Sequence, residues 1–472
     1  MSQRQVGNGQ GDQNRGKRPL VKSSKSVYTA LVMRYLQHTD PEIYQLVKEE
    51  EKRQRNVLEM IPSENYTSKA VMETLGTVLT NKYSEGFPKK RYYQGNDVID
   101  QVEMLAQERA QKLFDVPYVN VQPLSGSPAN SAVYFAILEN GDKMMGLTLA
   151  HGGHITHGHK LGLSGRFFTS VHYDLGDNQR LDYDAIEKMA LKEKPKLLIC
   201  GFTAYPRIID FKRFGQIAEK VGCYLMADIS HITGLIIAGV HPSPVPYAHI
   251  VTTTTHKTLR GPRGAMIMVT HKGLKKNPDL PQKLESAIIP GLQGGPHDNQ
   301  TAAIAVSLKE ASGKRFQKYG AQIVENAKAL AEELNKHGFD LVSGGTDNHL
   351  ILIDLRNKKV NGRVAAIALE AAGIVLNYNG VPGDTMPPLY ASGIRLGTPA
   401  ITTRGMKERD MKKVAVWINE TIEQVRGLEI PRDNKEARTE LMKKYRAYIA
   451  KNKKLMAIEK QVKKFCTRFP LP

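Results

Sequence analysis

Short apolar and β-branched runs alternate with helical segments through the middle of this chain. The runs at residues 197–200, 223–229, 250–254 and 265–269 contain few charged side chains, which is typical of strands buried on both faces of a sheet. Residues 98–113 instead carry apolar side chains at helical spacing. Alternation of strands and helices favours a mainly parallel sheet. The sequence therefore predicts an α/β fold.

The same pattern predicts how the chain is divided. At roughly 150 residues per domain the length suggests two or three domains. A helix is expected from Pro41, after the N-cap pair Thr39 and Asp40. A long helical stretch from Asn299 to about Leu334 precedes a strand at Leu350–Leu355. We expect a basic disordered arm (1–38), a helix and large domain (39–318), and a smaller αβ domain (319–472) ending in a basic helix whose apolar face carries Leu455, Ile458, Val462 and Phe465.

The two ends of the chain carry most of its positive charge. Lys and Arg number 67 against 47 Asp and Glu, which gives a net charge of +20. Residues 1–34 hold seven basic and one acidic side chains (+6), and residues 431–472 hold thirteen and four (+9). Such charge suits a phosphate backbone, but no RNP, zinc or helix-turn-helix signature accompanies it. We expect nucleic-acid binding only as a side activity of the basic ends.

Cysteine content indicates a reducing compartment, and hydropathy argues against a segment that spans a membrane. Only three cysteines occur, without a CxxC spacing, which argues against a disulfide framework. No stretch approaches the roughly 18 apolar residues that span a bilayer, so we expect no membrane association. The first 26 residues lack the apolar segment that directs secretion. We expect a cytoplasmic protein, with a mitochondrial presequence as the alternative.

A lysine and an acid follow two of the predicted strands. The segment 251–263, VTTTTHKTLRGPR, predicts a strand ending at His256 and Lys257, at the sheet edge where open α/β folds bind ligands. A partly desolvated lysine there can form a Schiff base with an aldehyde; a solvated lysine is the alternative. The strand at 223–229 ends in Asp228, with His231 beyond it, although Asp228 alone could cap a helix. Together the lysine and the acid indicate pyridoxal phosphate, which needs both.

Four further segments offer groups for such a cofactor and its substrate. Residues 124–130, LSGSPAN, form either a phosphate cradle before a helix or an ordinary turn. Four histidines within 151–159 could hold a metal, but the glycines favour a ligand-contacting loop, and we expect no metal. Residues 81–93 form either an acid–base loop around Glu85 or a solvated loop. Arg395, alone in an uncharged segment, binds either a substrate carboxylate or a structural partner.

Other catalytic motifs are missing from the sequence. No GxxxxGK(S/T), GxGxxG, HExxH or GxSxG string occurs. Nucleoside triphosphate hydrolysis, dinucleotide binding, zincin and α/β-hydrolase chemistry therefore have no motif support.

Five strings occur in the order in which serine hydroxymethyltransferases carry them: 61–65 (IPSEN), 81–93, 150–158, 252–264 and 392–402. The chain resembles that family from about Pro41 to its carboxyl end. The resemblance implies a pyridoxal phosphate enzyme of fold type I, shared with aspartate aminotransferase. It also implies the reversible conversion of L-serine and tetrahydrofolate to glycine and 5,10-methylenetetrahydrofolate, in a homodimer or tetramer with its active site at a subunit interface. An aldolase for threonine or phenylserine with the same fold is the alternative, and would need no folate pocket.

The resemblance implies a role for each matching residue around the cofactor. Lys257 would bond to the aldehyde, Asp228 would face the ring nitrogen, and His154 would stack on the ring. His231 would contact the phenolic oxygen, and Thr203 would lie beneath the ring. The phosphate would be held by Ser125, Gly126, Ser127 and His256, and from the neighbouring subunit by Tyr83 and the turn Gly294–Gly295.

The resemblance also implies which residues bind the substrates. Arg395 would bind the amino-acid carboxylate with Ser63. Glu85 would handle the proton of the substrate hydroxyl, and Tyr93 would assist the exchange of the lysine for the substrate amine. The folate site would be lined by Leu149, Gly153 and Asn379.

The chain departs from the family pattern at three positions near these residues. Lys89 stands where a glycine is usual, Phe87 replaces a tyrosine, and Thr203 replaces a serine. None of these changes removes a reacting group.

Overall fold

The computed structural model describes residues 33–472, so residues 1–32 of the predicted basic arm lie outside the described residues. The chain divides into two compact units, residues 1–53 and 54–472. In the first unit a short helix, α2 (Arg34–Thr39), precedes the start of α3 (Pro41–Asn56). Helix α3 begins at Pro41 as predicted, and the Asp40 carboxylate accepts the backbone N–H of Ile43 at 3.0 Å.

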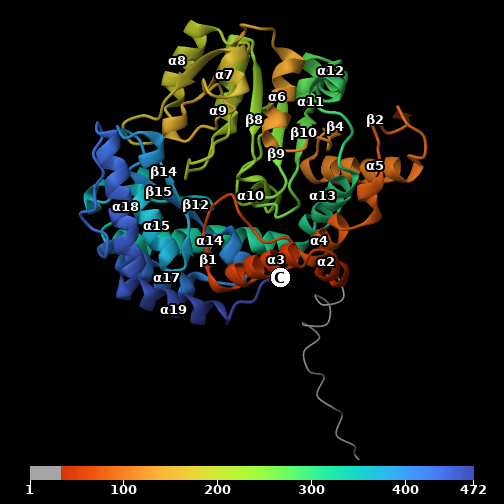
Figure 1. The fold of residues 1–472 in the computed structure, drawn as a ribbon. Helices are drawn as coiled ribbons and strands as arrows, with labels where there is room; N and C mark the ends of the chain where they lie inside the picture. Colours follow the sequence, from red (N-terminus) through yellow and green to blue (C-terminus); the bar gives the residue numbers. More distant parts are fainter. Residues whose placement is uncertain (1–32) are drawn as a thin grey trace, which may run out of the picture. The chain divides into compact units, whose positions relative to one another are not determined.

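A seven-stranded sheet forms the centre of the second unit (Figure 1). Its strand order is β4-β10-β9-β8-β7-β5-β6. The pairings from β9 through β6 are parallel, and β10 is antiparallel to both of its neighbours. The predicted α/β fold with a mainly parallel sheet is therefore confirmed. The strands are β4 (Tyr118–Asn120), β5 (Lys143–Leu147), β6 (Thr169–Tyr173), β7 (Leu197–Cys200), β8 (Tyr224–Asp228), β9 (Ile250–Thr254) and β10 (Ala265–Val269).

Both faces of this sheet are buried. Successive residues of β7, such as Leu197 and Leu198, enter two separate hydrophobic clusters, because side chains alternate across a strand. Helix α6 packs into one cluster, and α5, α8 and α9 contribute to the other. The helices of this region are α4 (Lys69–Leu75), α5 (Asp97–Phe114), α6 (Gly126–Ile137), α7 (Leu163–Phe167), α8 (Tyr183–Glu193), α9 (Phe211–Val221), α10 (Thr233–Ile237), α11 (His271–Lys276), α12 (Leu280–Ser286) and α13 (Asp298–Ala311).

A second, antiparallel sheet has the order β11-β12-β15-β14. It shares a hydrophobic core with the helices that follow it. Leu455, Ile458, Val462 and Phe465 of α19 are buried in that core, as their spacing predicts. The elements are β11 (Asp340–Leu341), β12 (Leu350–Asp354), α15 (Gly362–Ala371), β14 (Asn377–Asn379), β15 (Gly393–Gly397), α16 (Pro399–Thr403), α17 (Glu408–Glu423), α18 (Lys435–Lys451) and α19 (Lys453–Cys466).

Smaller elements complete the second unit. Strand β1 (Leu58–Glu59) pairs in parallel with β13 (Ile374–Val375), and β2 (Gly86–Phe87) forms a hairpin with β3 (Lys90–Arg91). Single helical turns occur at Val78–Asn81, Leu149–His151, Ala287–Leu292, Val342–Gly344, Arg356–Lys358 and Pro388–Tyr390. Within residues 33–472, no helix is both long and apolar enough to cross a bilayer.

The helical stretch predicted from Asn299 to Leu334 is two helices, which corrects the expectation of a continuous one. Helix α13 ends at Ala311, and α14 (Lys314–Lys336) starts after Gly313, whose extended backbone (φ −94°, ψ 154°) interrupts the helical path. Helix α14 contributes Phe316 and Ile323 to the core of the large sheet, and Leu330 and Leu334 to the core of the small one. One helix therefore supports both sheets.

Candidate active site

The carboxyl end of β8 lies beside the end of β9. Asp228 is the last residue of β8, Lys257 follows the end of β9, and Asp228 stands opposite Thr252 in the parallel pairing. Since parallel strands present their carboxyl ends at one edge, the acid and the lysine reach the same place. Gly201, after β7, has φ +100°, and a Cβ there would lie 1.9 Å from the Asp228 carbonyl oxygen. Only glycine allows this close backbone approach.

A cavity of about 330 Å³ opens at this edge. That size lies at the lower end of small-molecule sites. A larger hollow of about 570 Å³, around Asp182 and Arg213, contains none of the predicted site residues, so we place the candidate site in the smaller cavity. Eleven predicted residues line it: Ser63, Ser125, Gly126, Ser127, His154, Thr203, Asp228, His231, His256, Lys257 and Arg395.

Asp228 is a buried carboxylate that its neighbours keep ionised. Its Oδ2 accepts hydrogen bonds from Asn130 Nδ2 at 2.9 Å and His157 Nε2 at 3.2 Å, and its Oδ1 accepts the backbone N–H of Ser230 at 3.1 Å. Burial by itself would raise the pKa of Asp228, but the hydrogen bond and electrostatic interaction with His157, the interaction with His154 and the hydrogen bond from Asn130 hold that pKa well below its usual value. The carboxylate is therefore suited to face a protonated ring nitrogen.

Lys257 offers a partly buried amine that lines the cavity. Within residues 33–472 its Nζ has no hydrogen bond or ion pair. Its backbone carbonyl accepts a hydrogen bond from Asn65 Nδ2 at 2.9 Å, which fixes the main chain. Burial lowers the pKa of Lys257 to about 8, with Asp228 acting in the opposite direction and Arg395 in the same one. A substantial share of the amine is therefore neutral and nucleophilic near pH 8.

Arg395 brings a buried guanidinium to the same cavity from the middle of β15. Its Nη1 donates to the Thr203 carbonyl at 2.6 Å, and its Nε donates to Asn377 Oδ1 at 3.2 Å. In the part of the chain that the structure describes, no carboxylate pairs with Arg395. A guanidinium has five N–H donors, so some remain for an anionic ligand. Between the two alternatives for Arg395, this geometry favours ligand binding over a structural salt bridge.

Two predicted histidines line the cavity in their neutral forms. Burial lowers the pKa of His154 to about 4, and His154 Nδ1 lies 2.8 Å from Thr156 Oγ1. Burial also holds the pKa of His231 well below its usual value. His231 Nδ1 lies 3.2 Å from His349 Nε2, and the two rings stack. Neutral imidazoles can pack on a flat ring without adding to the positive charge of the cavity.

One end of the cavity combines groups that suit a phosphate. Ser125, Gly126 and Ser127 lie at the start of α6, and the Ser125 side chain makes no capping bond. The first N–H groups of a helix point outward and favour an anion. His256 Nδ1 is buried without a hydrogen-bond partner, and His256 Nε2 lies 3.4 Å from Arg263 Nη1. A buried orphan nitrogen in the same cavity as a helix start is available to a polar ligand.

Five predicted residues gather in a second cluster that does not line this cavity: Tyr83, Glu85, Tyr93, Gly294 and Gly295. Tyr83 OH donates to Glu85 Oε1 at 3.2 Å, and the rings of Tyr83 and Tyr93 lie 5.2 Å apart. A Cβ placed on Gly294 would lie 3.2 Å from Glu85 Oε1. The side chains of Tyr83 and Tyr93 are exposed. The structure thus places Glu85 and Tyr93 with the residues expected from a neighbouring subunit.

The three predicted folate residues lie outside the cavity wall. Leu149 is exposed in a helical turn, Gly153 follows that turn, and Asn379 ends β14. The loop of Leu149 approaches the cavity, since the carbonyl of Gly152 accepts the backbone N–H of Thr203 at 2.8 Å. A Cβ on Gly380, next to Asn379, would lie 3.8 Å from the Ala150 carbonyl oxygen.

Sequence reasoning assigned no role to seven residues that line the cavity, among them Asn130, His157 and Arg263. Asn130 Oδ1 also accepts a hydrogen bond from Thr252 Oγ1 at 2.7 Å, so Asn130 ties β9 to Asp228. All three stand inside segments that the sequence had singled out. His157 could have been suspected because it lies in the run of four histidines. The local sequence does not indicate, however, which of the four histidines contacts Asp228, which is 71 residues away. Within the described residues, no group of three or more His, Cys, Asp or Glu is arranged to hold a metal.

Comparison with known proteins decides the family. The family model for serine hydroxymethyltransferase matches residues 36–418. This chain belongs to the serine hydroxymethyltransferase family. A serine hydroxymethyltransferase of Desulfotalea psychrophila is 56% identical over 379 residues, which cover 80% of this chain and 88% of that protein. One of Acidothermus cellulolyticus is 56% identical over 383 residues, covering 81% and 88%.

Serine hydroxymethyltransferases depend on pyridoxal phosphate and have the fold that is called type I among enzymes using this cofactor. They use tetrahydrofolate as cosubstrate. The cavity fits that cofactor. It offers an unpartnered amine on Lys257, a carboxylate on Asp228 and an orphan nitrogen on His256 beside the start of α6. These are the groups that an aldehyde, a pyridine nitrogen and a phosphate require.

Proposed function

We propose that this chain converts L-serine and tetrahydrofolate reversibly to glycine and 5,10-methylenetetrahydrofolate, as a pyridoxal phosphate enzyme of one-carbon metabolism. One observation carries the proposal. A single cavity brings together the unpartnered amine of Lys257, the ionised carboxylate of Asp228 and the unpaired guanidinium of Arg395. Family membership and two relatives with this name support the same reaction.

The cofactor would be held by residues along the whole cavity. When bound, it supplies an aldehyde for an amine and a ring that accepts the electrons of a broken bond. Lys257 would hold the aldehyde, and Asp228 would keep the ring nitrogen protonated. His154, His231 and Thr203 would surround the ring. Ser125, Gly126, Ser127 and His256 would bind the phosphate.

Arg395 would orient the amino acid. Its free donors bind the carboxylate, and Ser63, on the same cavity wall, adds a hydroxyl. A carboxylate held at a fixed point determines which bond at Cα stands perpendicular to the ring, and hence which bond breaks. Arg395 and Ser63 therefore select the bond between Cα and Cβ over loss of the carboxylate.

The second cluster would act on a neighbouring subunit. Glu85 would take and return the proton of the serine hydroxyl, Tyr93 would assist the amine exchange, and Tyr83 with Gly294–Gly295 would complete the phosphate site. The segment is suited to an interface, since Met72, Val78, Tyr83, Tyr92, Tyr93 and Val98 are exposed around it. Contiguous exposed apolar side chains are typical of association surfaces. We infer a homodimer as the active unit.

Leu149, Gly153 and Asn379 would form the folate site beside the cavity. The residue after Asn379 lies beside the loop of Leu149, which supports assigning these residues to one site. We place the enzyme in the cytoplasm. Cys200, Cys223 and Cys466 are free and buried, as a reducing compartment allows.

Replacement of the lysine tests the function directly. Lys257→Ala removes the amine, so the purified variant should lack the visible absorption of the lysine-bound cofactor and lose at least about 1,000-fold in serine turnover. Lys358→Ala is the matched control, because Lys358 is a buried lysine that donates to the His337 carbonyl outside the cavity. Normal absorbance and turnover in Lys257→Ala would contradict the proposal.

Folate dependence separates the proposal from the aldolase alternative. Glycine formation from serine should rise strongly when tetrahydrofolate is added to the wild-type protein. Cleavage of threonine or phenylserine at an equal or greater rate, with no response to folate, would favour an aldolase.

A further inference from the structure

The backbone on both sides of Glu85 is bound by one buried arginine. Arg91 Nη1 donates to the carbonyl of Ser84 at 2.9 Å and to the carbonyl of Gly86 at 2.9 Å. The Glu85 carbonyl between them accepts the backbone N–H of Tyr92 at 2.9 Å. Three consecutive carbonyls of the loop are therefore fixed by hydrogen bonds. Because the main chain at Glu85 is fixed on both sides, the direction in which its side chain leaves the loop is fixed too.

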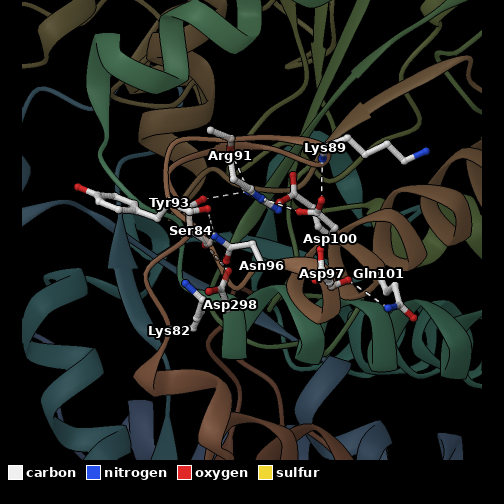
Figure 2. Close-up of polar contacts among 12 residues, drawn as sticks. Lys82, Ser84, Lys89, Arg91, Tyr93, Asn96, Asp97, Asp100, Gln101 and Asp298 are labelled. Carbon is white, nitrogen blue, oxygen red and sulfur yellow. Dashed lines mark hydrogen bonds and ion pairs between the residues drawn. The ribbon is translucent and has the colours of Figure 1, made fainter.

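Two carboxylates of helix α5 hold Arg91 in turn. Arg91 Nε donates to Asp100 Oδ1 at 2.8 Å (Figure 2). Arg91 Nη2 donates to Glu103 Oε2 at 2.6 Å. The side chains of Arg91 and Glu103 are only 4% and 2% exposed. A buried guanidinium is stable only when its charge and its donors have partners. Four hydrogen bonds to four different groups leave Arg91 no second orientation of comparable energy.

The network continues from the loop to the start of helix α13. Ser84 Oγ donates to Asp298 Oδ1 at 2.7 Å, and Gln122 Nε2 bridges the Gly86 carbonyl at 3.0 Å and Glu103 Oε1 at 2.8 Å. Asp298 closely follows the turn Gly294–Gly295, where a Cβ on either glycine would lie within 4 Å of both Tyr83 and Glu85. Hydrogen bonds thus join the loop of Glu85 to α5, to Gln122 and to the start of α13.

We infer that Arg91 is a positioning residue for Glu85: it acts on the reaction by fixing the carboxylate's direction and touches no substrate. This inference rests on the proposed function, because it assigns to Arg91 the support of the group that would move the hydroxyl proton. It predicts that Glu85 and Arg91 contribute to catalysis as a pair.

A double-mutant cycle on the holoenzyme tests this pairing. Glu85→Gln should lower kcat for folate-dependent serine cleavage about 100-fold. Arg91→Lys keeps the charge but cannot bind two carbonyls and two carboxylates at once, so a small displacement of Glu85 should cost about tenfold in kcat. Once Glu85 has become Gln, Arg91→Lys should cost less than about twofold more. KM for serine should stay unchanged, because Arg395 binds the carboxylate.

Controls separate positioning from loss of stability. Arg109→Lys is the matched control, since Arg109 lies on α5 and donates to the Ala305 carbonyl of α13 at 2.7 Å without touching the loop; its kcat should equal that of wild type. If Arg91→Lys does not fold, Asp100→Asn replaces that variant in the cycle. Asparagine removes the negative charge that binds Arg91 Nε but keeps an acceptor oxygen. Asp100→Asn should lower kcat about threefold in wild type and not in Glu85→Gln.

The outcomes distinguish the inference from the proposed function. Additive losses from Arg91→Lys and Glu85→Gln, or a folded Arg91→Lys holoenzyme with normal kcat, would overturn the positioning role. A Glu85→Gln variant with unchanged serine turnover would instead refute the role proposed for Glu85 itself.

Discussion

At the level of single residues, the charge balance of the cavity determines its chemistry. Arg395 is buried and Lys257 is partly buried, and both lack an ion-pair partner in the described part of the chain. Arg263 adds a third cation to the cavity wall, and the carboxylates on that wall are those of Asp228, which Asn130 and His157 already engage, and Glu64. The excess positive charge favours ligands with two anionic groups, such as a phosphate and a carboxylate. It also favours the neutral form of the Lys257 amine.

The lowered pKa of Lys257 predicts how attachment of the cofactor depends on pH. The neutral amine is the nucleophile, so the rate at which cofactor-free protein binds pyridoxal phosphate should rise with pH and level off above about 8. The development of the visible absorption band after mixing, followed from pH 6 to pH 10, measures this rate. Asp228→Asn should shift the midpoint to lower pH, because the Asp228 charge raises the pKa of Lys257. A rate that keeps rising to pH 10 in wild type would contradict the assignment.

At the level of elements, the hairpin β2–β3 explains one departure from the family pattern. Lys89 has φ +65°, the left-handed conformation in which glycine is usual. Such a conformation costs a residue with a Cβ roughly 1–2 kcal/mol. The backbone N–H of Lys89 donates to Asp100 Oδ2 at 2.7 Å, which offsets part of this cost and joins the turn to the Arg91 network.

Lys89→Gly should therefore stabilise the protein by about 1 kcal/mol or less, since glycine also gains freedom in the unfolded chain. Denaturant unfolding of the two proteins measures the change. Pro88→Ala, at the neighbouring position of the same turn, is the control for a general effect of altering the hairpin, and should not stabilise. A loss of stability in Lys89→Gly would mean that the lysine side chain makes a favourable contact.

The sequence predicted what local pattern determines. The strand ends placed Asp228 and Lys257 at one sheet edge, and eleven of the expected residues line the cavity. It did not predict the break at Gly313, because the apolar spacing runs on from one helix to the next. It also missed the link between Asn130 and Asp228, which joins groups 98 residues apart. Such contacts depend on how strands are ordered in the sheet, and no local spacing records that order.

At the level of the whole molecule, the separation of the two clusters predicts complementation between inactive subunits. If Glu85 serves the cavity of its partner, a mixed dimer of Lys257→Ala and Glu85→Gln has one site with both residues intact. Random mixing makes about half of the dimers mixed, each with one intact site, so about a quarter of the wild-type activity should return. Serine turnover after co-refolding or co-expression of the two variants measures this.

The matched control mixes two variants that both damage the cavity itself. In contrast, Lys257→Ala mixed with Arg395→Ala should regain no more than background activity if the two residues act within one subunit. Absence of recovery with Glu85→Gln would show that Glu85 serves its own subunit.

Nucleic-acid binding by the basic ends stays a prediction, and salt-dependent affinity with and without residues 1–32 would measure it.

The single helix α14, whose side chains enter both hydrophobic cores, restricts how the enzyme can open. A hinge between the two sheets would have to bend or fray this helix, at the expense of well-packed apolar contacts in both cores. Local opening motions that admit substrate should then be confined to peripheral loops. Amide hydrogen exchange along α14 should be as slow as in the central strands.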